Sequence, residues 1–283
     1  MHNRRENSLY SSPSEIADSA ISIGVRKANL STSAKFLLGI LAGAFIAFGA
    51  QAANLITHTI TDSASAKLTA GLIFPAGLIM VIMAGAELFT GNCLMIISLA
   101  ERRITFTKLL WSWLVVYAGN FAGSLIVAYL VSLSGQWNLT GGLLGGLTLK
   151  TAAAKISLSF TEALTLGILC NWLVCLAVWM SFGAKDGVSK AACIFFPIWV
   201  FIASGFEHSI ANMYYIPAGI LAKSNPSYVS RALEIGASQT GIDSLNVLRM
   251  FTRNLIPVTI GNIIGGCMFV GLAYWFVYLR GKK

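Results

Sequence analysis

Six long apolar stretches run through this chain, and each is long enough to cross a membrane as a helix. They cover residues 36–60, 68–99, 109–134, 158–182, 191–221 and 255–279. About 20 helical residues span the hydrocarbon core of a bilayer, where helices satisfy their own backbone polar groups. Because 56% of the 283 residues are hydrophobic and only 11% are charged, we predict an all-α membrane protein with six transmembrane helices.

The charged residues gather between and outside these stretches. Residues 1–35 are polar and contain no apolar signal-peptide core, so we expect a cytoplasmic arm at 1–35 and one transmembrane domain at 36–283. Of the 20 Lys and Arg residues, 13 lie on the arm, the second and fourth loops and the tail, and seven lie on the other three loops. This asymmetry predicts a multi-pass protein of the inner (plasma) membrane with both termini cytoplasmic. It also explains the net charge of +9 without a nucleic acid partner.

Two motifs occur twice in the same order, which indicates an internal repeat. The pattern G-x-E-x4-N appears at 85–92 and at 205–212, and G-N-x-x-G appears at 119–123 and at 261–265. A unit of three crossings enters the membrane from opposite sides in its two copies, so we predict a 3+3 inverted repeat. Glycines four residues apart let two helices approach closely, and the Asn beside them is expected to hydrogen-bond across the gap.

The second and fifth apolar stretches are predicted to be broken near the membrane centre. The second stretch is about 32 residues long, more than one straight crossing needs, and both stretches combine glycine with good N-cap residues. We expect helices to restart at Thr90 and Ser209 and to direct their free amides towards a shared centre, which suits an anion.

Ionisable residues at that depth need an explanation. His208 is expected to be functional, because an unpaired ionisable side chain inside a membrane is costly. Glu87 and Glu207 are expected to be structural and to accept hydrogen bonds from backbone amides at the breaks. The five cysteines lie in apolar stretches without metal-ligand spacing, so we expect no metal and no cofactor.

Four segments together resemble the formate/nitrite transporter family over nearly the whole chain: ELFTGN at 87–92, CNWLVCLAVWM at 170–180, GFEHSIANM at 205–213 and NLIPVTIGNIIGG at 254–266. The resemblance implies a homopentamer of aquaporin-like protomers, each with its own pore. It also implies a substrate pathway in which Thr90 and His208 are the central pair and Lys155 is the cation of the outer vestibule. The other pathway residues that it implies are Phe74, Leu78, Leu88, Phe89, Asn171, Val174, Phe201 and Asn262, with Glu207 beside them.

The hypothesis that follows is a channel for small monovalent weak-acid anions, most simply formate, with His208 able to supply a proton. Nitrite and hydrosulfide remain alternatives within the family, and a neutral-solute channel is an alternative outside it. An enzyme is not expected, because the apolar stretches offer few convergent ionisable groups. A sensor or scaffold acting through the arm is a further alternative. Also open is the role of the outer segment between the fifth and sixth stretches, which carries Arg231, Arg249 and Arg253.

Overall fold

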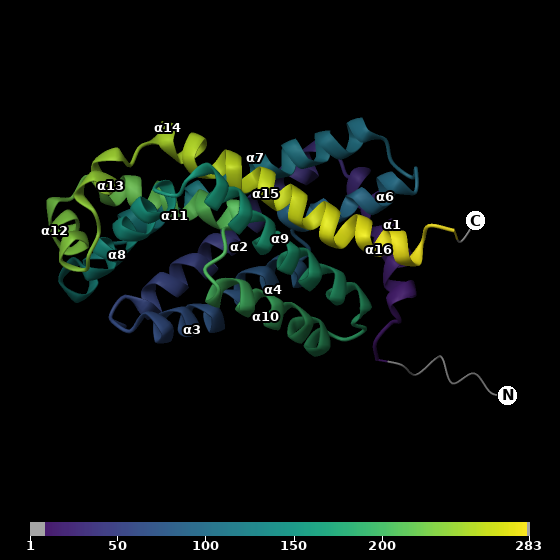
Figure 1. Ribbon diagram of the computed structural model, residues 1–283, viewed down its shortest axis with the longest axis horizontal. Helices are drawn as coiled ribbons and strands as arrows, with labels where there is room; N and C mark the ends of the chain where they lie inside the picture. The colour runs from purple at the N-terminus through teal and green to yellow at the C-terminus, as the bar shows by residue number, and fades with distance from the viewer. Residues whose placement is uncertain (1–8, 282–283) are drawn as a thin grey trace.

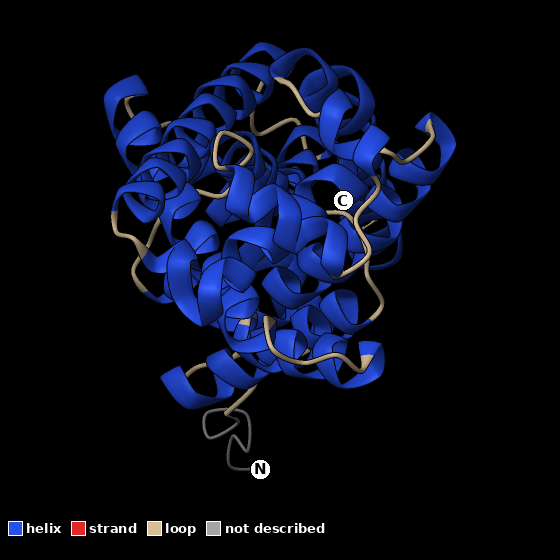
Figure 2. Cartoon of the chain, turned by 90° about the vertical axis from the view of Figure 1, so that its left-hand side faces the viewer, coloured by secondary structure: helices blue, strands red, loops and turns tan. Residues whose placement is uncertain are grey.

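The computed structural model describes residues 9–281, and these form helices joined by short loops, as Figure 2 shows. The only extended pairing within this range is an isolated bridge between Tyr10 and Ala184. The prediction of an all-α protein is therefore confirmed for the described part of the chain. The first part of the chain contains α1 (Pro13–Ala28), α2 (Thr32–Thr57), α3 (Ser63–Ile73), α4 (Pro75–Met83), α5 (Phe89–Asn92), η1 (Cys93–Met95), α6 (Ile96–Ala100) and α7 (Phe106–Leu133).

The second part begins with η2 (Gln136–Asn138), α8 (Leu139–Ile156), α9 (Phe160–Gly183), α10 (Gly187–Ala203) and α11 (Ser209–Ala222). It continues with α12 (Pro226–Glu234), α13 (Gln239–Ser244), α14 (Val247–Arg249), η3 (Met250–Leu255), α15 (Ile256–Gly266), η4 (Cys267–Leu272) and α16 (Ala273–Tyr278). Between Ile156 and Phe160, and between Ala222 and Pro226, the loops are short. The outer segment between the fifth and sixth apolar stretches, whose role the sequence left open, contains α12, α13 and α14.

Five helical rods within residues 9–281 are long and apolar enough to cross a membrane. They are Thr32–Thr57, Ser63–Met83, Phe106–Leu133, Phe160–Gly183 and Val247–Tyr278. The stretch 191–221 is divided instead between α10 and α11, and the apolar helix Phe89–Ala100 continues the second rod after an interruption. Several rods begin at polar caps, since Ser31, Thr105 and Ser159 each accept a hydrogen bond from an amide of the first turn.

Two helix pairs pack unusually closely, α2 against α7 and α9 against α15. A Cβ atom on Gly123 of α7 would lie 2.0 Å from the carbonyl oxygen of Ile40, and one on Gly265 of α15 would lie 2.2 Å from that of Ile168. Only glycine fits at such a distance. The predicted function of G-N-x-x-G in close packing is therefore confirmed at both copies.

The molecule is elongated, and different helices form its two ends (Figure 1). Helices α12, α13 and the start of α8 lie at one end, which we call the α12 end. Helix α1 and helix α16 lie together at the opposite end, which we call the α1 end. Large apolar side chains are exposed along the rods between the ends, for example Leu114, Leu130 and Phe276, which are 61%, 58% and 56% exposed. These rods present the apolar surface that a lipid bilayer requires.

Candidate functional site

Two breaks in the helices build the centre of the molecule. Helix α4 ends before Gly85 and α10 ends before Gly205, and these glycines have φ angles of +79° and +73°. That left-handed conformation is favourable for glycine and strained for other residues, which explains why the chain turns at these two positions. The extended backbone of 86–88 and 206–208 then leads into the half-helices α5 and α11.

The half-helices begin slightly differently from the prediction. Helix α5 starts at Phe89 with Leu88 as its N-cap, so the expectation that Thr90 caps it is wrong, and Thr90 lies inside the first turn. Helix α11 starts at Ser209 as expected. Its N-cap is His208, whose side chain accepts a hydrogen bond from the amide of Ala211.

The asparagines of the two G-N-x-x-G motifs hold the breaks in place. Asn120 Oδ1 accepts from the amide of Phe89 at 2.9 Å, while its Nδ2 donates to the carbonyl oxygens of Glu87 and Gly39 at 2.9 and 2.8 Å. Asn262 makes the matching three contacts with Ser209, Glu207 and Gly167 at 2.9, 3.0 and 2.8 Å. Each amide side chain replaces the helical partners that the broken backbone has lost.

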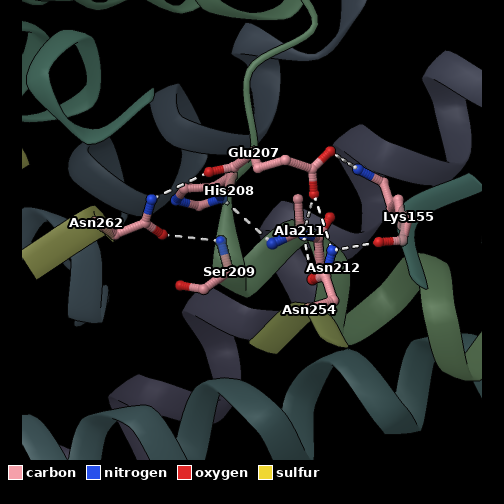
Figure 3. Close-up of polar contacts among 8 residues, drawn as sticks. All are labelled: Lys155, Glu207, His208, Ser209, Ala211, Asn212, Asn254 and Asn262. Atoms are coloured by element: carbon pink, nitrogen blue, oxygen red, sulfur yellow. Dashed lines mark hydrogen bonds and ion pairs between the residues drawn. The ribbon is translucent and has the colours of Figure 1, made fainter. Parts of the chain in front are cut away.

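The carboxylates therefore have a different function from the predicted one. Figure 3 shows the Glu207 carboxylate between the Lys155 ammonium and the side chains of Asn212 and Asn254. Glu207 Oε1 lies 2.8 Å from Lys155 Nζ, and Oε2 accepts from Asn212 Nδ2 at 2.6 Å and from Asn254 Nδ2 at 3.2 Å. The expectation that it binds backbone amides is wrong, because the asparagines of α7 and α15 already occupy the amides at which α5 and α11 begin. The carboxylate is instead a counter-charge for a half-buried lysine.

A second ion pair at the other break was missed in the sequence. Lys27 of α1 lies 2.9 Å from Glu87 Oε1 and also donates to Asn92 Oδ1 at 2.9 Å, and Asn92 Nδ2 donates to Glu87 Oε2 at 2.8 Å. The sequence does contain a signal for this pair. The pattern K-x-x-L-S occurs at 27–31 and at 155–159, before the first and fourth apolar stretches. Helices α1 and α8 thus hold equivalent lysines.

The side chains of Thr90 and His208 meet in the interior, with 2.9 Å between Thr90 Oγ1 and His208 Nε2. Both residues are buried, at 0% and 3% exposure. Because His208 Nδ1 accepts from the amide of Ala211 at 3.2 Å, the proton of a neutral imidazole is carried by Nε2, which then donates to Thr90. The hydroxyl hydrogen of Thr90 is not used in this contact and can be donated to another acceptor.

Two cavities approach this contact from opposite sides. The Lys155 cavity has a volume of about 520 Å³, and Lys155, Phe201, Glu207 and His208 contribute to its wall. The Lys27 cavity has a volume of about 360 Å³, and Lys27, Leu78, Glu87 and Leu88 contribute to its wall. His208 lies on the wall of the first cavity, and Thr90 stands between Leu88 and Gly91 of the second. The Thr90–His208 pair therefore lies between residues that line the two cavities.

The remaining predicted pathway residues lie around this centre without lining either cavity. Phe74 packs edge-on against Phe201, with ring centroids 5.6 Å apart. Phe89 packs against Tyr117 at 4.9 Å and is directed towards α7. Asn171 Nδ2 donates to the carbonyl oxygens of Thr90 and Asn262, at 3.2 and 2.6 Å. Val174 is buried on α9, at 2% exposure.

Metal binding has no support in the described residues, since no group of three or more His, Cys, Asp or Glu side chains there is arranged for an ion. The cysteines within this range are free thiols, and four of the five are buried. The chemistry at the centre consists of one imidazole, one hydroxyl and two lysine–glutamate pairs.

Comparison with known proteins agrees with the motifs. A family model described as formate/nitrite transporter matches residues 14–276. The formate channel FocA of Escherichia coli K12 is 42% identical over 273 residues, which cover 95% of this chain and 94% of the relative. A solved structure described as a pentameric formate channel with formate bound superposes with a TM-score of 0.79 at 38% identity and covers 88% of this chain and 98% of its own. An ion channel of the same family gives a TM-score of 0.78 at 29% identity, over 93% of this chain and 98% of its own.

Proposed function

Because the chain belongs to the formate/nitrite transporter family, we propose that it is a channel for small monovalent weak-acid anions and that formate is its cargo. The observation that carries this proposal is the Thr90–His208 contact at 2.9 Å, which lies between the walls of the two cavities. Relatives named as formate channels support the choice of formate.

The proposed path begins in the Lys155 cavity. The Lys155 ammonium attracts the anion, and Glu207 limits how tightly it is held, since the pair is 2.8 Å apart. At the wall of this cavity the anion meets the ring of Phe201, against which Phe74 packs, and there lost hydration is only partly replaced. Such a constriction favours small monovalent species. The Thr90 hydroxyl donates to the carboxylate at the centre, and Leu78 and Leu88 border the way into the Lys27 cavity.

We further propose proton coupling at His208. A formate ion beside Nε2 gains a proton there and crosses the second apolar constriction as the neutral acid, at a much lower solvation cost. The ring stays neutral only if water in the Lys155 cavity, whose wall includes His208, gives a proton to Nδ1 at the same time, and Nδ1 then loses its hydrogen bond from the Ala211 amide. Coupling thus requires the first turn of α11 to loosen transiently.

The test is formate flux into liposomes over a range of pH, for the parent protein and for His208→Asn. Asparagine keeps a donor near Thr90 but does not titrate, so we expect formate still to pass and the pH dependence of flux to disappear. An unchanged pH dependence in His208→Asn would refute proton coupling. If the parent protein does not select formate over chloride, the channel proposal itself is refuted.

The same proposal includes the organisation of the whole protein. Matching contacts at Glu87 and Glu207, and at Asn120 and Asn262, support a 3+3 inverted repeat with broken second and fifth spans. The charge asymmetry supports insertion in the inner (plasma) membrane with both termini cytoplasmic. Residues 1–35 are proposed to act as an arm on a channel domain formed by 36–283.

The assembly is proposed to be a homopentamer, as in the solved relative with formate bound. Native mass spectrometry of the detergent-solubilised protein is expected to give five times the 30.2 kDa chain mass. Fluorescent-protein and alkaline-phosphatase fusions at each terminus test the orientation, because only a cytoplasmic terminus gives fluorescence without phosphatase activity.

A further inference from the structure

A cavity at the α12 end has no function in the proposed path. It has a volume of about 520 Å³ and lies beside the Lys155 cavity, with which it shares Leu158. Its wall includes two arginines and several hydroxyl side chains, namely Arg249, Arg253, Ser157, Ser159, Ser238 and Ser244. We call it the arginine cavity. It collects residues from α8, α9, α13, α14 and η3, so only the folded chain forms it.

The two arginines of this cavity have exposed side chains that make no polar contact within the described part of the fold. Arg249 and Arg253 are four residues apart on one continuous helical rod and therefore project from the same side of it. Across residues 9–281 neither guanidinium has a hydrogen-bond or ion-pair partner. Arg231 in the same outer segment differs, because it is bound to Glu234 at 2.7 Å and to the carbonyl oxygen of Gly141 at 3.0 Å.

The acid in the wall, Glu162, forms no ion pair with either arginine among the described residues, and one carboxylate against two guanidinium groups leaves the cavity with a net positive charge. Glu162 Oε2 accepts from the amide of Ser159 at 2.7 Å, as part of the capping box that starts α9. The hydroxyls of Ser157 and Ser244 donate only to carbonyl oxygens of their own helices, at 2.8 and 2.9 Å. Such local bonds exchange readily for a stronger acceptor. The arginine cavity thus offers two free guanidinium groups and reorientable hydroxyls.

We propose that the arginine cavity binds a phosphate group. A guanidinium binds two oxygens of one phosphate in parallel, and two guanidiniums four residues apart accommodate an acceptor that has several oxygens. Formate offers only two oxygens and fills a small part of 520 Å³. Phosphate is available either as the headgroup phosphodiester of a membrane phospholipid or as the free ion.

The surroundings of the arginine cavity favour the lipid as the source. Val247 and Leu248 precede Arg249 on α14 and are 56% and 72% exposed. Phe251 between the arginines is 36% exposed. Apolar side chains beside cationic ones are typical of a helix at the membrane surface, where the acyl chains and the headgroup of one lipid are both in reach.

The experiment measures binding to the intact detergent-solubilised assembly with two probes, dioleoylphosphatidylglycerol and inorganic phosphate. Lipid retention is measured by native mass spectrometry and phosphate binding by calorimetry. The test variant carries Arg249→Gln and Arg253→Gln. The control carries Arg103→Gln and Lys185→Gln, which remove the same charge from exposed positions at the α1 end.

We expect the parent and the control to bind the lipid equally and the test variant to bind it at least ~10-fold more weakly, because two charge-assisted contacts are lost. Arginine-dependent binding of inorganic phosphate without retention of the lipid would identify the free ion as the ligand. Equal binding of both probes by the parent and the test variant would overturn the proposal. Formate flux does not enter this readout, so failure of the channel proposal would leave it standing.

Discussion

At the scale of single residues, the two lysine–glutamate pairs show how charge is accommodated inside an apolar protein. Lys155 and Glu207 have side chains that are 15% and 8% exposed, and the asparagines beside them satisfy the second carboxylate oxygen. Removing one partner of such a pair leaves an uncompensated charge in a poorly hydrated place. Arg231 and Glu234 at the α12 end have the same charges but side chains that are 41% and 52% exposed.

This contrast predicts that replacing the glutamate by glutamine lowers stability by different amounts in the two pairs. Glu207→Gln leaves the Lys155 ammonium without its counter-charge and is expected to destabilise the protein by on the order of 3 kcal/mol. Glu234→Gln is expected to cost below about 1 kcal/mol, because water screens the exposed pair. The midpoint of thermal unfolding in detergent checks both variants. Similar midpoints for the two would contradict our account of the Glu207 pair.

At the scale of helices, the interiors of α2–α7 and α9–α15 depend on backbone contact rather than on large side chains. Gly43 and Gly265 each face a carbonyl oxygen of the partner helix, so their Cα atoms lie against the opposite backbone. The close approach also brings Asn120 and Asn262 within reach of the breaks. Helix packing and the geometry of the pore centre are therefore coupled.

The coupling predicts that a single methyl group at these interfaces has a large effect. Gly43→Ala places Cβ 2.1 Å from the Asn120 oxygen, and we expect a loss of about 3 kcal/mol or more in stability, together with reduced formate flux. Gly187→Ala is the matched control, because its nearest neighbour is the flexible end of Met83 at 3.3 Å. It is expected to stay within about 1 kcal/mol of the parent. If Gly43→Ala folds and still carries formate at the parental rate, helix packing is not coupled to the pore centre and this prediction is wrong.

At the scale of the whole molecule, the Lys155 and Lys27 cavities each have a lysine–glutamate pair in the wall, but different helices border them. Helix α8, from the middle of the chain, supplies Lys155 to the Lys155 cavity. Helix α1, from the N-terminal arm, supplies Lys27 to the Lys27 cavity. Besides its lysine–glutamate pair, the Lys155 cavity has Lys67 in its wall, and the Lys27 cavity has Arg26 and Lys190. An anion approaching from either side therefore meets a wall in which positive charge is in excess.

This arrangement predicts sided effects of the two lysines. Lys155→Gln is expected to lower formate current several-fold when formate is added on the α12 side, and Lys27→Gln when it is added on the α1 side, because each ammonium concentrates anions in its own cavity. Planar-bilayer recordings at low ionic strength measure this, and high salt should reduce both differences. Lys185→Gln, an exposed charge outside both cavities, serves as the control. Equal loss from both sides would contradict separate vestibules.

Removal of residues 1–28 tests the arm at the same scale. It deletes the whole of α1, including Lys27, and with it part of the wall of the Lys27 cavity. We expect single-channel formate conductance to rise, because the cavity becomes wider at its mouth, and stability to fall, because Glu87 loses its partner. Lys27→Gln in the full chain separates the loss of charge from the loss of the helix. Unchanged conductance after deletion would identify the arm as a passive tail.

The family resemblance implied Thr90 and Lys155, whereas the sequence alone determined the helical class, most of the apolar rods, the two breaks and the place of His208 beside one of them. These follow from local properties: the length of an apolar run, a glycine where the backbone turns, and a histidine at a depth where it must have a purpose. The repeated motifs also indicated which distant segments correspond. A third repeated pattern, at Lys27 and Lys155, was overlooked.

The tertiary structure decided which partner each polar group binds. Glu87 and Glu207 were expected to bind backbone amides, but Asn120 and Asn262, brought in by close helix packing, occupy the amides that open α5 and α11. The carboxylates are thus left for Lys27 and Lys155. Competition among donors and acceptors depends on distances of tenths of an ångström between helices far apart in the chain, and no pattern along the sequence contains that information.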